Sequence, residues 1–208
     1  MSDGDAWLAR VQRLRAIAQT GLAYSRDGYD LERFEEVSTI AQALLAELTA
    51  TPPQQIADLY VPERGYPTPK VDVRAGVFRD GQVLLVREAA DGRWSLPGGW
   101  ADEHCSPRQS VEREVLEESG FRVRAVKLAA LKDRHLHPYR PVRMERIYKL
   151  LFVCDLEGGA AATSLETTAA GFFALDALPE LSIGRTLAAD IELLAAHHRQ
   201  PELPPYFD

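Results

Sequence analysis

The chain is poor in cysteine, in long apolar runs and in positive charge. Its two cysteines, Cys105 and Cys154, lie far apart in the sequence, so neither a disulfide framework nor a cysteine metal site is predicted. Apolar runs such as VLLV and KLLFV are far shorter than the roughly 20 residues of a membrane-spanning helix. The first residues, MSDGDAW, lack the pattern of a secretory signal, so we expect a cytoplasmic protein with no membrane partner.

The charge balance is acidic. A net charge of −7 over 208 residues argues against stable nucleic-acid binding, which depends on a basic face. It leaves open a nucleotide that is held through a metal ion. The composition, 46% hydrophobic and 26% charged, is typical of a globular chain with room for one well-buried domain and a smaller one.

The first third of the chain has the periodicity of helices. We expect a helix over 5–23, broken by Gly21 and the RDGYD segment, a second from an Asp30 N-cap to about Thr49, and a short third over 53–60. The apolar residues of the first helix recur every three or four positions: Trp7, Val11, Leu14, Ala18 and Leu22. The segment VPERGYPTP, with its three prolines, indicates a linker. The prediction is a small all-α domain over residues 1–66.

Residues 67–208 have the shorter period of strands. VDVRAGVF and QVLLVRE are joined by Asp80-Gly81, a strong hairpin signal, and RWSLPGGW is a strand that runs into a glycine loop. A helix over 106–119 ends at Gly120, and a last helix spans 184–200. Further strands are expected over 121–133, 146–156 and 168–178. Strands before, between and after helices, without steady βαβ alternation, favour a mixed α/β sandwich.

The helical segment SVEREVLEESGF concentrates negative charge. At about 100° per residue, Glu114, Glu117 and Glu118 share one face, whereas Glu112 projects almost opposite. Like charges at this spacing repel by roughly a few tenths of a kcal/mol per pair. A divalent cation among them removes the repulsion, and hard carboxylate oxygens select Mg²⁺ or Mn²⁺. The alternative is a solvated acidic helix without a ligand.

The glycine loop and this helix together resemble the Nudix box. That pattern is a Gly, five residues, a Glu, seven residues, then Arg-Glu, an aliphatic residue, any residue, Glu-Glu, any residue, Gly and an aliphatic residue. The positions in register here are Gly99, Arg113, Glu114, Val115, Glu117, Glu118 and Gly120, and Phe121 takes the last place. The resemblance implies a Nudix α/β/α sandwich with a mixed sheet over residues 67–208.

Cys105 departs from the pattern, because it stands where the box has its first Glu. In the family this Glu often supports the arginine, so its loss would leave Arg113 short of a partner. A catalytic role for the Cys105 thiol is the alternative, although no base lies next to it in the sequence. The adjacent Gly98 and Gly99 let the backbone approach a bound substrate closely.

The resemblance also assigns roles to the acidic residues. Glu114, Glu117 and Glu118 are the implied metal ligands, and the Gly98 carbonyl is a backbone contributor. Arg113 would orient the glutamates. Glu166 lies where some Nudix enzymes place a catalytic base or an extra ligand, with an ordinary exposed glutamate as the alternative.

Four residues outside the box are candidates for substrate contacts. Arg74 shares a strand face with Asp72, so its planar guanidinium binds either a phosphate or a neighbouring acid. His135 and His137 share a face if their strand continues, and we expect a substrate-contacting or exposed loop there. Tyr139 either stacks on a base or is a surface aromatic.

Segments outside the box, including LARVQRLRAIAQTGL and SLETTAAGFF, are similar to a Nudix subgroup that acts on nucleoside diphosphates linked to another moiety, such as ADP-ribose or CDP-choline. This likeness implies a homodimer formed through the helical segment. It also implies hydrolysis of a diphosphate bond with Mg²⁺ or Mn²⁺, giving a nucleoside monophosphate and a phosphorylated product. Two alternatives stay open: a catalytically impaired Nudix domain that senses a nucleotide, and cleavage of RNA ends.

Overall fold

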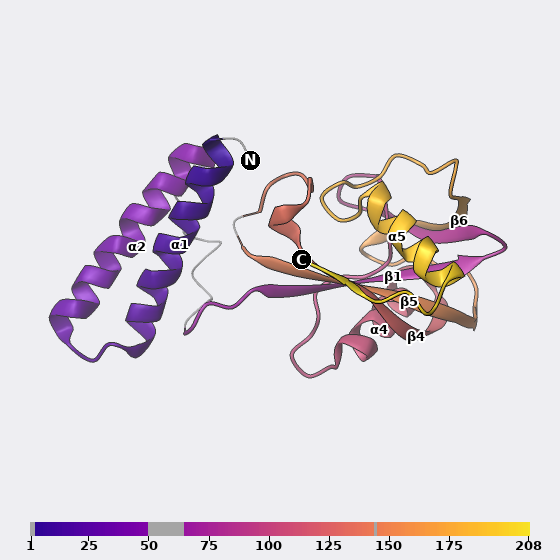
Figure 1. Cartoon of the computed structure of the whole chain (residues 1–208), viewed down its shortest axis with the longest axis horizontal. Helices are drawn as coiled ribbons and strands as arrows, with labels where there is room; N and C mark the ends of the chain where they lie inside the picture. Colours follow the sequence, from indigo (N-terminus) through magenta and orange to yellow (C-terminus); the bar gives the residue numbers. More distant parts are fainter. Residues whose placement is uncertain (1–2, 50–64, 144) are drawn as a thin grey trace. The chain divides into compact units, whose positions relative to one another are not determined.

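The computed structural model describes residues 3–49, 65–143 and 145–208 (Figure 1). The chain divides into two compact units, Met1–Thr68 and Pro69–Asp208. The short helix predicted over 53–60 lies outside the described residues. None of the helices described is both long and apolar enough to span a membrane.

The first unit is a helical hairpin of α1 (Asp3–Tyr24) and α2 (Gly28–Thr49). The prediction that Gly21 breaks α1 is wrong, because α1 continues through it. The Phe34 ring packs so closely there that a Cβ on Gly21 would lie 2.4 Å from the ring, which explains the glycine. Asp30 is not the cap of α2 either. The Oδ1 atom of Asp27 accepts the backbone N–H groups of Tyr29 and Asp30 at 3.0 and 3.1 Å.

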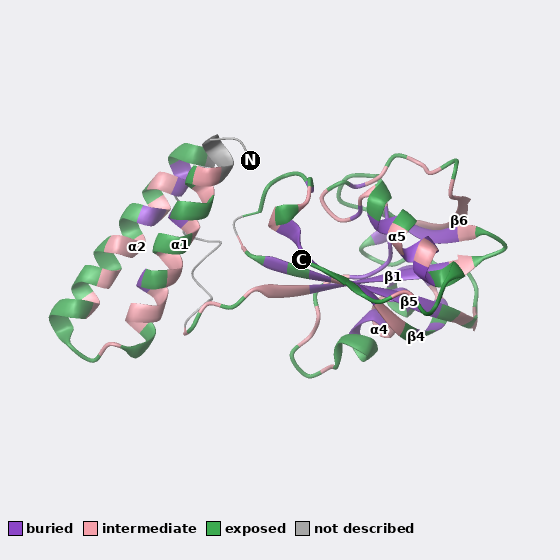
Figure 2. Ribbon diagram, viewed as in Figure 1, coloured by how far each residue is buried: buried purple, intermediate pink, exposed green. Residues whose placement is uncertain are grey.

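The hairpin buries only part of its apolar stripe. Val11 and Ala18 of α1 and Leu45 of α2 are fully enclosed, as the spacing predicts. Trp7, in contrast, is 54% exposed. Other large apolar side chains on these two helices are also exposed: Leu14, Ile17, Ile40 and Leu48. Figure 2 shows how much of both helices is in contact with solvent. The helical period is therefore confirmed, whereas burial of the whole stripe is not.

The second unit is built on a mixed sheet. The strands are β1 (Lys70–Arg79), β2 (Gln82–Glu88), β3 (Trp94–Ser95), β4 (Phe121–Asp133), β5 (Ile147–Gly159), β6 (Thr167–Ala174) and β7 (Tyr206–Phe207). Their order is β3-β2-β1-β5-β4-β7, and β6 pairs with β2. The β1–β5 and β4–β7 pairs are parallel, and the others are antiparallel. The predicted mixed sheet is thus confirmed, and β7 was too short to predict.

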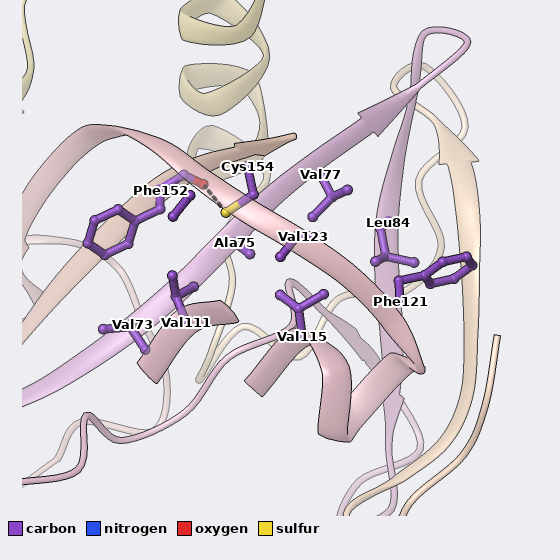
Figure 3. Packing of buried hydrophobic residues seen from close by; sticks show 11 residues of the cluster. Val73, Ala75, Val77, Leu84, Val111, Val115, Phe121, Val123, Phe152 and Cys154 are labelled. Atoms are coloured by element: carbon purple, nitrogen blue, oxygen red, sulfur yellow. Dashed lines mark hydrogen bonds between the residues drawn. The ribbon is translucent and has the colours of Figure 1, made fainter. Parts of the chain in front are cut away.

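One helix covers each face of the sheet, which confirms the sandwich. Val111 and Val115 of α4 (Pro107–Ser119) pack against Val73, Ala75 and Val77 of β1 (Figure 3). Cys154 lies in the same cluster, so it is a core residue. On the other face, α5 (Ala188–Arg199) places Ile191 and Leu194 against Leu85 and Leu151. The alternation of side chains along β1 separates the two cores.

Local signals fix the ends of α4. The Ser106 Oγ accepts the N–H of Gln109, and the Gln109 side chain accepts the N–H of Ser106, which is a capping box. Pro107 opens the first turn. Gly120 ends the helix in the left-handed conformation with φ 76°, as predicted. These signals set where the four glutamates of the helix lie.

Candidate active site

A cavity of about 800 Å³ lies in the second unit. Its lining comes from β1, the end of β2, the glycine loop, α4, β5 and three loops, around 134–143, 164–166 and 184–185. Three carboxylates of α4, here called the acidic set, line it: Glu114, Glu117 and Glu118. Among the described residues, six cations line the same cavity, and four of them are here called the basic set: Arg74, Arg134, Arg143 and Lys149. Opposite charges therefore share one cavity.

The glycine loop runs along β1 in place of a further strand. Val73 N–H donates to the Gly99 carbonyl at 2.8 Å, and Ala101 N–H donates to the Val71 carbonyl at 2.9 Å. The Gly98 N–H donates to the Glu118 carboxylate at 2.7 Å. A Cβ on Gly99 would lie 2.8 Å from a carboxylate oxygen of Glu114. A larger residue at this position would therefore displace this carboxylate from the loop.

The carboxylates of the acidic set are crowded and partly dehydrated. Glu118 is 5% exposed, and burial raises its pKa to about 8, although Arg74 and the Gly98 N–H oppose the shift. Burial also raises the pKa of Glu114, and the charge of Glu117 adds to it. The Glu117 side chain is more open, at 60% exposure. The like-charge repulsion predicted for this helix face is thus present in the folded chain.

The donor chemistry of the acidic set fits a hard divalent cation, because carboxylate and carbonyl oxygens suit Mg²⁺ and Mn²⁺. A ready-made arrangement is absent, however: over the described ranges 3–49, 65–143 and 145–208, no three His, Cys, Asp or Glu side chains converge as a metal site. Glu114 and Glu118 still approach the glycine loop from one side of the cavity. These are the residues that could hold the ion.

Arg113 does not lack a partner, so that expectation is wrong. Its Nη2 lies 2.6 Å from an Asp102 carboxylate oxygen, and this hydrogen bond raises the pKa of Arg113. The same guanidinium lies 3.6 Å from Glu114 and 3.5 Å from Glu117. Cys105 remains a weak neighbour, with its Sγ 3.8 Å from Nη1. Asp102 has taken over the supporting contact that the first Glu of the box often provides.

Arg74 forms an ion pair with a neighbouring acid, which is one of the two interactions predicted for it. Its Nε and Nη2 donate to Asp72 at 3.2 and 2.9 Å, and its Nη1 donates to the Leu96 carbonyl at 3.0 Å. Lys149 shares Asp72, at 2.5 Å, and burial lowers the pKa of Lys149 to about 8. Because two buried cations share one carboxylate, the pair with Asp72 does not cancel the positive charge at the cavity.

His137 and Tyr139 are not brought to the cavity. The chain leaves β4 through the 3-10 turn η1 (Arg134–Leu136), so His135 and His137 do not share a strand face. His137 Nε2 lies 3.1 Å from the Asp208 carboxylate. Tyr139 is 1% exposed and donates its hydroxyl to Asp190, so the expectation of a surface or base-stacking ring is wrong.

Glu166 lies at the cavity, on the loop before β6. Its N–H donates to Ser164 Oγ at 3.1 Å, and its carbonyl accepts the Ala89 N–H at 2.8 Å. The side chain is exposed, as is that of Leu165 beside it. The backbone is thus held, and the carboxylate is available to a substrate.

The sequence did not reveal several lining residues. Glu88 is buried, accepts the Ser95 hydroxyl and pairs with Arg185 at 3.1 Å. Lys149 had one available signal, a lysine inside the apolar run YKLLFV. Arg134 had none, because only the fold brings it to the same cavity as the box.

Comparison with known proteins agrees with this geometry. Residues 5–60 match the model of a UDP-X-like, N-terminal oligomerisation domain, and residues 68–194 match that of the NUDIX domain. The chain is 43% identical over 202 residues to the "Putative ADP-ribose pyrophosphatase YjhB" of Bacillus subtilis (strain 168), covering 97% of each protein.

Two solved structures are similar as well. An ADP-ribose pyrophosphatase from Streptococcus suis 89-1591 is 40% identical with a TM-score of 0.63, covering 68% of this chain and 100% of that one. A UDP-X diphosphatase is 30% identical with a TM-score of 0.63, covering 100% of each chain. The chain therefore belongs to the Nudix hydrolases, enzymes that cleave pyrophosphate bonds, and carries the UDP-X-like N-terminal domain in front of the Nudix domain.

Proposed function

We propose that the enzyme uses Mg²⁺ or Mn²⁺ to hydrolyse the diphosphate bond of a nucleoside diphosphate linked to another moiety. The products are a nucleoside monophosphate and a second phosphorylated compound. The observation that carries the proposal is the cavity in which the box glutamates and the basic set meet. A diphosphate with its metal ion matches both kinds of charge.

The residues divide into three roles. Glu114, Glu117 and Glu118, with the Gly98 carbonyl, would hold the ion, which when bound supplies charge neutralisation for the diphosphate and an activated water. Arg113 positions Glu114 and Glu117 from its anchor on Asp102. For substrate, we propose contacts with Arg74 and the Gly99 backbone, and with Glu166 as the base: Arg74 and Glu166 line the cavity, and Gly99 forms part of its wall.

We place ADP-ribose first among the substrates, because two relatives with similarity over long stretches are described as ADP-ribose pyrophosphatases. UDP-linked compounds follow from the UDP-X diphosphatase, and CDP-choline stays in the test panel. The assay measures product release from these compounds and from a nucleoside triphosphate, each with Mg²⁺ and with Mn²⁺. Turnover confined to the triphosphate would contradict the proposal.

Glu118→Gln tests the role of the acidic set. We expect turnover to fall by about two orders of magnitude or more, because a ligand of the ion is lost. The matched control is Glu192→Gln, at an exposed position on α5, which should keep wild-type rates. A folded Glu118→Gln variant with near wild-type turnover would refute the assignment.

We also propose a homodimer formed through the helical domain, with the domain boundary at residues 66 and 67. Support comes from the exposed apolar side chains of α1 and α2 and from the oligomerisation domain that matches residues 5–60. Ile40→Glu places a charge on this surface, at a residue that is 51% exposed. We expect the mass in solution, measured by light scattering, to fall from dimer to monomer, and an unchanged mass would contradict the proposal.

A nucleotide sensor without catalysis is the second candidate, and the departure of Cys105 from the box was the reason to consider it. The Asp102–Arg113 ion pair removes this reason, because Arg113 still has a carboxylate partner. Binding of ADP-ribose without product release under either metal would nevertheless favour the sensor over the enzyme.

A further inference from the structure

Arg134 is a buried cation at the cavity. It begins the turn η1 immediately after β4, is 4% exposed and lines the cavity. Its Nη2 donates to the Pro141 carbonyl at 2.7 Å and to the Gly184 carbonyl at 3.3 Å. No Asp or Glu within the described residues forms an ion pair with it. A buried charge without a counter-ion is costly, unless a ligand provides the opposite charge.

The surroundings of Arg134 include a second cation. Burial lowers the pKa of Arg134 and the charge of Arg143 lowers it further, whereas Tyr139, Asp72 and Glu145 act in the opposite direction. Arg143 is exposed and lines the same cavity. Arg134 and Lys149 both lie against the Tyr139 ring, at 5.4 and 5.2 Å from its centroid. The Tyr139 hydroxyl is in turn fixed to Asp190, so the ring is a rigid support for both cations.

Four other cations of the cavity have carboxylate partners. Arg113 pairs with Asp102, and Arg185 pairs with Glu88. Arg74 and Lys149 share Asp72, which leaves this group with one positive charge beside the acidic set. Arg74 acts electrostatically on both Glu114 and Glu118. The charges that act on Arg134 are those of Arg143, Tyr139, Asp72 and Glu145, and none of the acidic set is among them. We therefore take Arg134 to lie farther than Arg74 from the carboxylates that would hold the ion and the scissile diphosphate.

We propose that Arg134 and Arg143 form an anion subsite for a phosphoryl group of the substrate that lies outside the scissile diphosphate. The inference rests on the proposed function and deepens it, because it defines a class of substrate: nucleoside diphosphate derivatives that carry a further phosphomonoester. The planar guanidinium of arginine suits a phosphate better than the ammonium of lysine does. The rigid Tyr139 ring holds the guanidinium of Arg134 in place.

The experiment measures binding of inorganic phosphate to the full chain by calorimetry, in EDTA, so that no metal ion contributes. Wild-type protein should bind phosphate, and Arg143→Met should weaken binding roughly tenfold, because a charge-assisted contact is lost. Arg199→Met at the exposed end of α5 removes the same charge away from the cavity and should bind like wild type. Absence of phosphate binding by wild-type protein, or equal affinity of Arg143→Met, would overturn the subsite.

A second arm uses the intact enzyme with its metal ion. The ratio of kcat/KM for 2′-phospho-ADP-ribose to that for ADP-ribose should exceed one and should fall roughly tenfold in Arg143→Met. Arg134→Lys keeps the charge but loses the planar guanidinium, and the folded variant should show the same tenfold fall in this ratio. Glu118→Gln should bind phosphate in EDTA at least as tightly as wild type while losing turnover. Phosphate binding without any hydrolysis would refute the proposed function alone. Hydrolysis with the same ratio of kcat/KM values in wild type and in Arg143→Met would refute the subsite alone.

Discussion

The stability of the metal-free protein should depend on the protonation of Glu118. Its pKa is raised from 4.5 to about 8, chiefly by burial, and Glu88 and Glu114 add to the shift. Between these two pH values the folded protein retains a proton that the unfolded chain has released. The free energy of unfolding therefore falls as the pH rises from about 4.5 to about 8.

The size of this fall follows from the same two pKa values. Each pKa unit corresponds to about 1.4 kcal/mol, so the full difference corresponds to about 5 kcal/mol, and we take this as the upper limit. Because the Glu118 side chain is 5% exposed, solvent screening reduces the value little. Glu118→Gln removes the titrating group and can still accept the Gly98 N–H. In EDTA at pH 8 we expect the variant to be about 2–5 kcal/mol more stable than wild type, with little difference near pH 4.5.

Urea unfolding followed by tryptophan fluorescence measures this effect. A Trp7→Phe background restricts the signal to Trp94 and Trp100, which belong to the Nudix unit. Wild type and Glu118→Gln are compared in EDTA at several pH values from 4.5 to 8.5. In a parallel series with Mg²⁺, wild type should regain stability at pH 8 more than at pH 5, because the ion competes with the proton.

Two results would refute the reasoning. Parallel pH profiles for wild type and Glu118→Gln would mean that Glu118 does not hold a raised pKa. A variant less stable than wild type at pH 8 in EDTA would mean that the buried carboxylate is compensated in the folded state.

Four further substitutions test the loop, the core and the support of Arg113. Gly99→Ala should lower kcat by about 10–100-fold with little loss of stability, because its Cβ would lie 2.8 Å from the Glu114 carboxylate and displace it; steady-state kinetics and urea unfolding check this. Val115→Ala should cost about 1–3 kcal/mol in urea unfolding, since the side chain is fully buried under β1. Asp102→Asn should lower kcat/KM about tenfold, whereas Cys105→Ser should stay near wild type. An inactive but folded Cys105→Ser would restore the thiol hypothesis.

Features set by neighbouring residues were predictable from the sequence. The strands from 70 to 159, the start of α4 at Ser106 and its end at Gly120 follow from turn, cap and period signals within a few residues. Helical period alone also placed the box glutamates on one face. The N-cap of α2 shows the limit of such signals, because Asp27 and Asp30 both offer a carboxylate and only the structure separates them.

Contacts between distant segments were not predictable. Asp72 and Lys149 meet because β1 and β5 pair in parallel in one register, and no local pattern specifies that register. Tyr139 was misjudged for the same reason, since its partner Asp190 lies on α5. The spacing correctly placed Trp7 on the apolar face of α1, but spacing does not specify whether another surface covers that face, and Trp7 is 54% exposed.

The Cys105 position illustrates that a motif is judged better by where its charged groups lie in the structure than by the residue type at each sequence position. The box expects a carboxylate at 105 to support Arg113, and a cysteine there suggests a lost function. In the folded loop, however, Asp102 reaches the same guanidinium at 2.6 Å. A loop can thus present a carboxylate to the same arginine from more than one sequence position. We therefore expect catalytic competence to depend on the partner of Arg113 and not on the identity of residue 105.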